Sequence, residues 1–246
     1  MENFKSQQFR SELAKQIKET PQDKRKEIFE KAKQTPEYWQ ARGEKISERQ
    51  NEEEVDDGLG VLVKRKTFYH GSGTSRIKDF NKAEEDTVGS GVYFTSKAKN
   101  AIGYARRRSR TSREKDASPV IYESFVENMR LLNLRKDENV KKILVGFGKI
   151  LVEKLKNKDL TWNQRDMFLE ALGAINSGKV GSGNLRKVTF GIGQMFSNYC
   201  EILGYEGLIT FEGGEGDDVG SHDTYLIFDP KKVKINQEQK ILKNSP

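Results

Sequence analysis

A histidine, a glycine-rich turn and two tyrosines have the residue types and the spacing to do chemistry together. His70 follows the aromatic and β-branched run Thr67–Tyr69, which predicts a short strand. The next three residues, 71–73, are Gly-Ser-Gly, and glycine lets backbone approach a ligand closely. Tyr93 and Tyr104 follow further along the chain, eleven residues apart. An imidazole at a strand end, beside bare backbone and two aromatic rings, is suited to hold a flat, amide-bearing ring with an attached ribose.

Strands and one helix must position these residues. Val92–Thr95 predicts a second strand that opens directly after a Gly-Ser-Gly turn, and a helix from Ser96 would carry Tyr104. Residues 119–126 alternate as a further strand. Residues 204–211 and 222–230 predict the turn and the strands that complete a sheet. These elements would therefore present the imidazole at a strand end, the glycine-rich backbone beside it and the two tyrosines.

These motifs resemble a known family. Tyr-His-Gly at 69–71, GSGVYFT at 89–95 and the alanine–tyrosine helix up to residue 105 are followed in order by GYEGLITF at 204–211 and LIFDP at 226–230. Together they are similar to the ADP-ribosyltransferase fold of the diphtheria-toxin and poly(ADP-ribose) polymerase type, and to the ADP-ribosyltransferase domains of phage and mobile-element polyvalent proteins. The resemblance covers roughly 66–135 and 204–236. It implies an α+β fold with a split β-sheet.

The resemblance also implies a set of residue roles with NAD as co-substrate. In the family the motif histidine binds ribose hydroxyls, the backbone of the next glycine binds the nicotinamide carboxamide, and the two tyrosines sandwich the nicotinamide ring. The matching residues here are His70, Gly71, Tyr93 and Tyr104. We expect Ser72 to add to the NAD site, and His70 and Tyr93 to take part in catalysis as well as in binding.

The family's catalytic carboxylate has no direct counterpart. In many relatives it lies four residues before the phenylalanine of the FDP segment, and that position is Thr224, which we expect in the NAD site. Asp223 is its neighbour, and regular strand alternation would place the two on opposite faces. A bulge at the start of the strand would turn Asp223 inward. We expect Asp223 to be the catalytic carboxylate, with a strand-initial capping role as the alternative.

Other residues compete for this role. The preceding loop holds further acids, which are Glu212, Glu215, Asp217 and Asp218. A threonine in the carboxylate position also fits a variant that has lost or altered its transferase power. His222 has no motif around it, and we expect it to be incidental or to reach the cleft from its loop.

A basic run follows the predicted Tyr104 helix. Residues 106–113 hold five arginines in eight positions, within a chain of net charge +7. A solvated surface loop is one interpretation. The other is a phosphate-binding patch, for the pyrophosphate of the dinucleotide or for a nucleic-acid acceptor, because the planar guanidinium donates two parallel hydrogen bonds. The run lacks the interleaved aromatics that stack single-stranded bases.

Composition excludes several classes. The 246 residues are 34% hydrophobic and 33% charged, which is enough for one sizeable domain with an appendage. The apolar runs are too short to span a bilayer, and the N-terminus is unlike a secretory signal. The single cysteine, Cys200, excludes an intrachain disulfide, and two histidines without a cysteine cluster argue against a metal site. We expect a cytoplasmic protein, in the host cell if the chain is phage-encoded.

The pattern of helices and charges divides the chain. Residues 1–60 predict a helical appendage and an acidic linker, and the appendage is a possible contact for a partner. Residues 61–240 form the ADP-ribosyltransferase-like domain, in which 137–203 predict a helical insertion. Residues 241–246 form a tail.

The leading hypothesis is an ADP-ribosyltransferase of the glycosyltransferase class. It would transfer ADP-ribose from NAD to a macromolecular acceptor, protein or nucleic acid, with release of nicotinamide, and it could serve as a phage or mobile-element toxin or effector. One alternative is an NAD glycohydrolase. Another is a catalytically degenerate nucleotide- or nucleic-acid-binding module or phage structural component, which Thr224 favours and His70, Tyr93 and Tyr104 disfavour.

Overall fold

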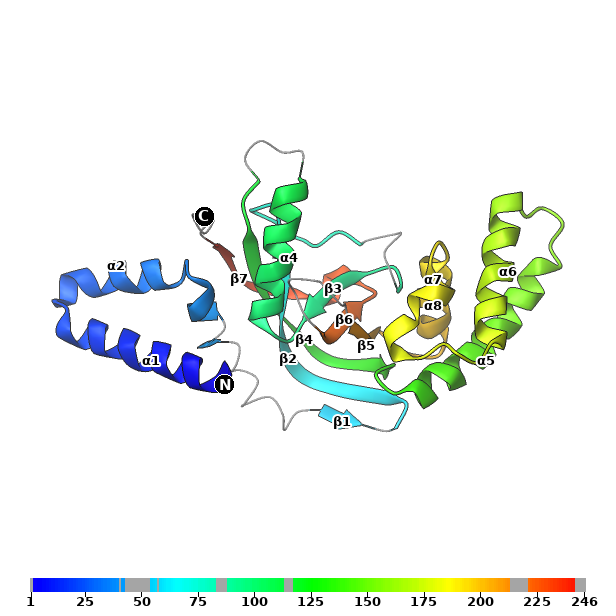
Figure 1. Ribbon diagram of the computed structural model, residues 1–246, viewed down its shortest axis with the longest axis horizontal. Coiled ribbons are helices and arrows are strands. Elements are labelled where there is room, and N and C mark those ends of the chain that lie inside the picture. Colours follow the sequence, from blue (N-terminus) through cyan, green and yellow to red (C-terminus); the bar gives the residue numbers. More distant parts are fainter. Residues whose placement is uncertain are drawn as a thin grey trace.

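The strands occupy the middle of the molecule and helices lie at both ends (Figure 1). The computed structural model describes residues 2–39, 41–42, 54–56, 58–82, 88–112, 117–212 and 221–241. The strands are β1 Glu54–Asp56, β2 Gly60–Ser72, β3 Val92–Thr95, β4 Val120–Asn133, β5 Gly207–Glu212, β6 His222–Ile227 and β7 Lys234–Lys240. The α-helices are α1 Glu2–Glu19, α2 Gln22–Ala32, α4 Ala98–Thr111, α5 Asp137–Leu155, α6 Trp162–Asn176, α7 Arg186–Thr189 and α8 Gly193–Ile202. Short 3₁₀ turns span Ser182–Asn184 (η1) and Pro230–Lys232 (η2).

The sheet is split between β2 and β3. The strand order is β1-β2-β3-β6-β5-β4-β7, and β2 also pairs with β4. That second pairing is long and runs from Gly60↔Leu132 to Ser72↔Val120, whereas β2 pairs with β3 only at Tyr69↔Thr95. The expected α+β fold with a split sheet is confirmed, and the gap between the two strands opens beside the candidate site residue His70.

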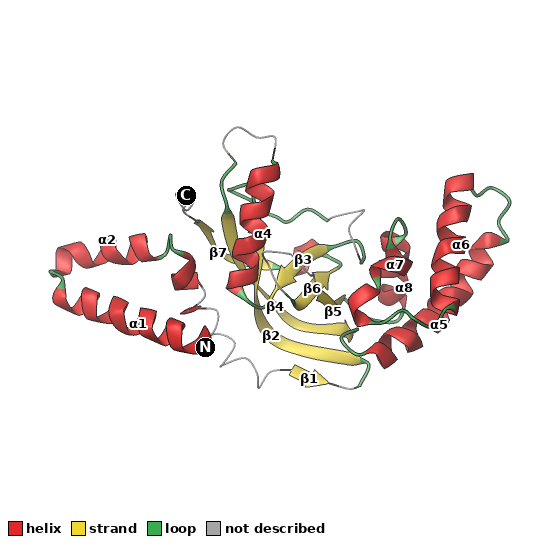
Figure 2. Cartoon of the chain, in the orientation of Figure 1, coloured by secondary structure: helices red, strands yellow, loops and turns green. Residues whose placement is uncertain are grey.

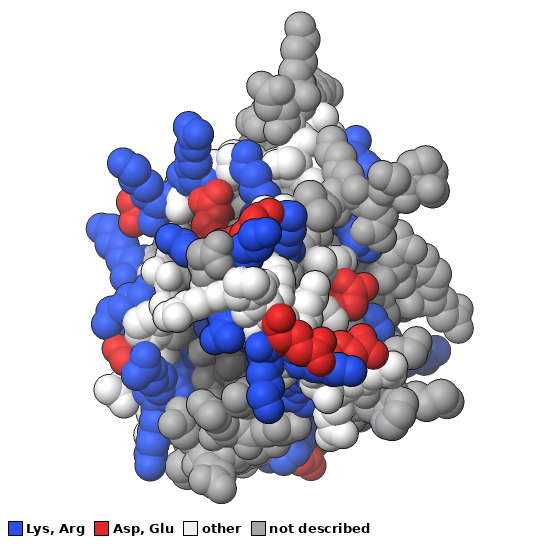
Figure 3. Space-filling model, turned by 90° about the vertical axis from the view of Figure 1, so that its left-hand side faces the viewer, with Lys and Arg blue, Asp and Glu red and all other residues white. Residues whose placement is uncertain are grey.

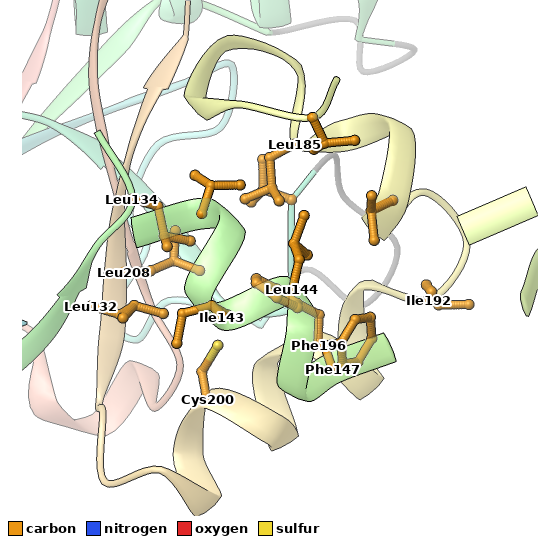
Figure 4. Close-up of a cluster of buried hydrophobic side chains, with 14 of the residues drawn as sticks. Leu132, Leu134, Ile143, Leu144, Phe147, Leu185, Ile192, Phe196, Cys200 and Leu208 are labelled. Carbon is orange, nitrogen blue, oxygen red and sulfur yellow. The ribbon is translucent and has the colours of Figure 1, made fainter. Parts of the chain in front are cut away.

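Helices α5 to α8 follow β4 and pack on one side of the sheet (Figure 2). The i, i+3, i+4, i+7 pattern of α5 buries one apolar face against α8 and the strands. Figure 4 shows Ile143, Leu144 and Phe147 of α5 close to Phe196 and Cys200 of α8. Helix α6 is capped by Thr161, whose side chain accepts a hydrogen bond from the backbone amide of Gln164 in a capping box. Burial raises the pKa of the Cys200 thiol, so this cysteine behaves as a core residue.

The N-terminal segment is anchored to the sheet by one tryptophan and one arginine. Helices α1 and α2 form a hairpin at one end of the molecule, and Lys and Arg side chains gather along one side of that end (Figures 1 and 3). Residues 36–39 and 41–42 are helical, and Trp39 is fully buried against Tyr69 and α4. The acidic linker expected at the end of residues 1–60 contains a strand, since residues 54–56 form β1, which pairs with β2.

Removal of the Arg42 side chain is expected to destabilise the fold. Arg42 Nη2 lies 2.7 Å from Oε1 of Glu123, whose side chain is 2% exposed, and Arg42 Nε bonds the other carboxylate oxygen. Among the described residues, Arg42→Ala would leave this buried carboxylate with one side-chain partner, the amide of Asn236. We expect a loss of about 3 kcal/mol in unfolding free energy, measured by urea denaturation, because an unpaired buried charge is costly.

The double variant Arg42→Ala/Glu123→Gln is the control for this prediction. It removes the unpaired charge as well, and it should recover part of the lost stability. A loss below about 1 kcal/mol in the single variant would show that the pair is a surface-type salt bridge of small value.

Candidate active site

A cavity of about 1000 Å³ lies at the split in the sheet. Its floor comes from β2, β3, β5 and β6, one wall from α4, and the other wall from η1 and α7. All six residues that the sequence assigns to the NAD site line it, and these are His70, Gly71, Ser72, Tyr93, Tyr104 and Thr224. The fold therefore brings these six candidates together around one space.

His70 lies in the gap between the strands as a neutral imidazole. Its Nδ1 is 2.8 Å from the carbonyl oxygen of Tyr93, and since a carbonyl only accepts, Nδ1 carries the proton. The ring packs edge-on against Phe80 and Phe94, with centroids 5.0 and 5.8 Å away. Burial lowers the pKa of His70, so the ring is uncharged near neutral pH. The Nε2 atom is then an acceptor for a hydroxyl group.

Gly71 allows α4 to lie directly on β2. A Cβ atom at this position would be 2.0 Å from the carbonyl oxygen of Ala101 and 2.7 Å from the amide nitrogen of Ala105. Two residues on, a Cβ at Gly73 would be 3.0 Å from backbone atoms of α4. This close approach carries Tyr104, on the same helix, to the cavity. The role of the Gly71 backbone toward a carboxamide stays a prediction.

The two tyrosines are held by different contacts. The hydroxyl of Tyr93 donates to the carbonyl oxygen of Gly89 at 2.7 Å and accepts from the amides of Val88 and Gly89, which fixes its ring beside the 88–89 turn. The hydroxyl of Tyr104 donates to Oε2 of Glu212 at 2.7 Å. The expected stacking of both tyrosines on a nicotinamide ring stays a prediction. The structure also shows that the Tyr104 hydroxyl holds the carboxylate of Glu212.

Glu212, His222 and Thr224 form a polar cluster around the Tyr104 hydroxyl. The Tyr104 hydroxyl has one proton, which it donates to Glu212. The hydroxyl oxygen of Tyr104 therefore accepts a hydrogen bond from Nε2 of His222 at 3.2 Å. The same Nε2 is 3.3 Å from Oγ1 of Thr224. Glu212 and His222 are directly paired residues of β5 and β6, so their side chains share the cavity face of the sheet. The cluster fixes one carboxylate at the base of the cavity.

The expectation that Asp223 reaches the cavity is wrong. The register of β5 and β6 runs without a bulge from Gly207↔Ile227 to Glu212↔His222. Asp223 is therefore turned to the opposite face from its neighbours, where its Oδ2 lies 3.2 Å from Nη1 of Arg135. Glu212 is the one carboxylate among the described residues that line the cavity. The other loop acids named above, Glu215, Asp217 and Asp218, lie outside the described part of the chain.

The basic run is helical for most of its length, and only part of it faces the cavity. Residues 106–111 belong to α4, which corrects the expectation of a surface loop, and Arg113 lies outside the described residues. Arg107 and Arg108 line the cavity and are exposed, whereas Arg106 and Arg110 do not line it. The helical turn thus divides the run between two faces.

The opposite wall was not foreseen from the sequence. Ser182, Gly183 and Arg186 line the cavity from η1 and α7. Asp137 at the start of α5 holds this wall, because its Oδ1 accepts from the amide of Ser182 at 2.7 Å and from its hydroxyl at 3.0 Å. The amide hydrogen bond is the main cause of the lowered pKa of Asp137. No short sequence motif marks these residues as part of the site, because only the folding of the helical segment brings them to the cavity.

The described residues offer neither a metal site nor a membrane-spanning helix. No group of three or more His, Cys, Asp and Glu side chains in that part of the chain is arranged to hold a metal ion. No helix there has the length and apolar character needed to cross a membrane.

Comparisons with known proteins agree with the sequence motifs. The sequence model of a family described as ADP-ribosyltransferase in polyvalent proteins matches residues 64–240, well over half of the chain. No curated protein sequence matches the chain. Among solved structures, the chain is similar to the crystal structure of the M. tuberculosis MbcT–MbcA toxin–antitoxin complex, with 14% sequence identity and a TM-score of 0.36. This similarity covers 81% of this chain and 91% of that chain.

Proposed function

The chain belongs to the family of ADP-ribosyltransferases in polyvalent proteins, and from this membership we propose that it transfers ADP-ribose from NAD to a macromolecular acceptor and releases nicotinamide. One observation carries the proposal. A single cavity holds a neutral His70, with Nε2 as an acceptor, and a carboxylate, Glu212, fixed by the hydroxyl of Tyr104. A hydroxyl-binding group and a fixed negative charge are what cleavage of a ribosyl bond requires.

The cavity residues fit NAD as a substrate. The volume of about 1000 Å³ is at the upper end of the range for small-molecule sites. His70 would accept a hydrogen bond from a ribose hydroxyl. The backbone of 70–72 lines the cavity beyond the last β2–β3 pair, where it can meet the carboxamide. The fixed ring of Tyr93 offers a surface for the nicotinamide.

The proposed reaction breaks one bond and makes one. The bond between C1′ of the ribose and the nicotinamide nitrogen breaks, and nicotinamide leaves as a neutral molecule with the bonding electrons. A nucleophilic atom of the acceptor bonds to C1′ and releases one proton. Positive charge develops on the ribose in between, and Glu212 stabilises it through a carboxylate that is already oriented.

Incubation of the purified full chain with labelled NAD tests this function. We expect free nicotinamide, measured by chromatography, and label on a macromolecule when cell lysate is present. Nuclease and protease sensitivity then identify the labelled species. Nicotinamide release without any labelled macromolecule would assign the site to NAD hydrolysis instead. If the protein binds NAD but releases no nicotinamide, alone or with lysate, the proposed enzymatic function is wrong. That result would support a catalytically degenerate binding module.

Tyr104→Phe is expected to lower turnover while the aromatic ring is kept. The substitution removes the donor to Glu212, and a hydrogen bond to a charged group contributes about 1.5–3 kcal/mol. We therefore expect a fall of about 10- to 100-fold in the rate of nicotinamide release at saturating NAD. Calorimetric titration should give an NAD affinity close to that of the wild type. Unchanged turnover would show that only the ring of Tyr104 matters, as a pure clamp predicts.

A further inference from the structure

His222 is the second of the two histidines in the chain, and the proposed reaction gives it no part. It is the first residue of β6, it lines the cavity, and its side chain is 3% exposed. Its ring packs edge-on against the ring of Tyr104, with the centroids 5.6 Å apart. On the paired strand β5, its direct partner is Glu212. The fold therefore holds this imidazole in one place beside the carboxylate at the base of the cavity.

The hydrogen bonds around the Tyr104 hydroxyl run in one direction. A carboxylate only accepts, so the Tyr104 proton points to Oε2 of Glu212, 2.7 Å away. Nε2 of His222 lies 3.2 Å from the same hydroxyl oxygen, so this nitrogen carries a proton and is the donor. Oγ1 of Thr224 is a second acceptor for the same N–H, at 3.3 Å. The hydrogen bonds thus lead from His222 through Tyr104 to Glu212.

The opposite tautomer of His222 would weaken the hold on the carboxylate. With its only ring proton on Nδ1, the imidazole would present a bare Nε2 to the Tyr104 hydroxyl. A hydroxyl has one proton to donate, so this nitrogen and Glu212 would compete for it. A donor at Nε2 removes the competition, and successive hydrogen bonds polarise one another, which strengthens the bond to the carboxylate. The position of one proton on His222 thus decides how firmly Glu212 is oriented.

The two histidines of the cavity carry their protons on different nitrogens. Nδ1 of His70 donates to the carbonyl oxygen of Tyr93, which leaves its Nε2 as an acceptor. His222 uses Nε2 as a donor toward Tyr104. An acceptor suits a ribose hydroxyl, whereas a donor suits the hydroxyl that must give its proton to a carboxylate. The difference between the two rings therefore separates a binding role from a positioning role.

We propose that His222 is a positioning residue of the transferase site and acts through Tyr104. Its Nε2–H fixes the direction of the Tyr104 proton and thereby orients the carboxylate of Glu212 toward the ribose. This inference rests on the proposed transferase function. His222 exchanges no proton with NAD or the acceptor, and its N–H stays bonded to Tyr104 while nicotinamide leaves. Its effect should therefore appear in the rate of the reaction rather than in the binding of NAD.

The first part of the test is NMR of the full chain labelled with isotopically enriched histidine. With two histidines in the chain, the ring-nitrogen signals are assigned by His70→Gln and His222→Gln. We expect a proton on Nδ1 of His70 and a proton on Nε2 of His222. Tyr104→Phe should shift the ring signals of His222 and leave those of His70 nearly unchanged. This measurement uses no NAD, so it does not depend on enzymatic activity.

The second part is nicotinamide release at saturating NAD. His222→Leu should lower the rate by about 10-fold, because the hydrogen bond that directs the Tyr104 proton is lost. NAD affinity, measured by calorimetry, should stay close to that of the wild type. His222→Gln keeps an N–H donor near the place of Nε2 and should recover most of the lost rate. In the Tyr104→Phe background, His222→Leu should change the rate by less than about twofold, because the residue through which it acts is already altered.

Several outcomes would overturn the proposal. A bare Nε2 in the NMR spectrum of His222 would contradict the direction of the hydrogen bonds. Equal losses from His222→Leu in the wild-type and Tyr104→Phe backgrounds would show that His222 acts only on the general structure, and so would a glutamine variant as slow as the leucine variant. If the wild-type protein releases no nicotinamide, the proposed transferase function is wrong, whereas the NMR measurement still decides the direction of the hydrogen bonds. The two proposals can therefore fail independently.

Discussion

Replacement of Glu212 by glutamine is expected to lower nicotinamide release by at least about 10²-fold. Glutamine keeps the shape of the side chain and its hydrogen bond to Tyr104, but it removes the negative charge at the base of the cavity. Loss of one preorganised electrostatic partner costs on the order of 10²–10³ in rate. NAD affinity should stay close to the wild-type value, because the charge acts on the ribose cation of the transition state rather than on bound NAD.

Asp223→Asn is the matched control, since it removes the same charge from a neighbouring strand. Asp223 lies on the other face of the sheet, paired with Arg135, and it does not line the cavity. Its substitution should change turnover less than twofold. The measurement is steady-state nicotinamide release, with thermal unfolding of both variants to confirm that they are folded. A large loss in Asp223→Asn together with an active Glu212→Gln would return the catalytic role to Asp223.

The local half of the site could be predicted from the sequence. His70 lies near the C-terminal end of β2, and Tyr93 and Tyr104 are separated by one strand and less than two helical turns. Short spacings of this kind leave few ways to arrange the elements, so the motif order already placed these side chains around one space. The periodic stripe of α5 and the capping box at Thr161 are also local signals, and the structure contains both elements.

The carboxylate could not be placed because it depends on strand register. A shift of one residue turns a side chain to the other face of a sheet. Glu212 ends β5 and Asp223 is the second residue of β6, and residues 213–221 separate the two strands. Only the register Glu212↔His222 decides which acid faces the cavity. The alternation of side chains along β5 could have indicated Glu212, because Thr210 and Glu212 lie on the same face of the strand as the buried Leu208.

The far wall and the N-terminal anchor lie beyond any local signal. Arg186 reaches the cavity only because α5 to α8 fold back toward the sheet, and the sequence of these helices shows core-forming stripes rather than a binding motif. Trp39 and Arg42 lie in a strongly charged stretch that has too few apolar residues for a core of its own. Their partners, Tyr69 and Glu123, are distant in sequence, so only the tertiary structure pairs them.

Gly71→Ala is expected to destabilise the fold by at least about 3 kcal/mol. The added Cβ would lie 2.0 Å from the carbonyl oxygen of Ala101, and this neighbour is helix backbone rather than a flexible side chain. Overpacking of a core costs typically 1–3 kcal/mol, and more where the backbone must move. Helix α4 would have to shift away from β2, and Tyr104 would move away from Glu212 with it. In any folded fraction, nicotinamide release should fall together with stability.

Gly173→Ala in α6 is the control for the same chemical change, because nothing lies within 4 Å of the added Cβ. That variant should gain about 0.5–1 kcal/mol, as alanine does in a helix interior. Urea denaturation of both variants separates two explanations of Gly71. If the glycine served only to present its backbone to the carboxamide, alanine would keep the same amide and carbonyl, and stability would stay at the wild-type value. A stable and active Gly71→Ala protein would therefore contradict the direct seating of α4 on β2, and with it the route by which Tyr104 reaches the carboxylate.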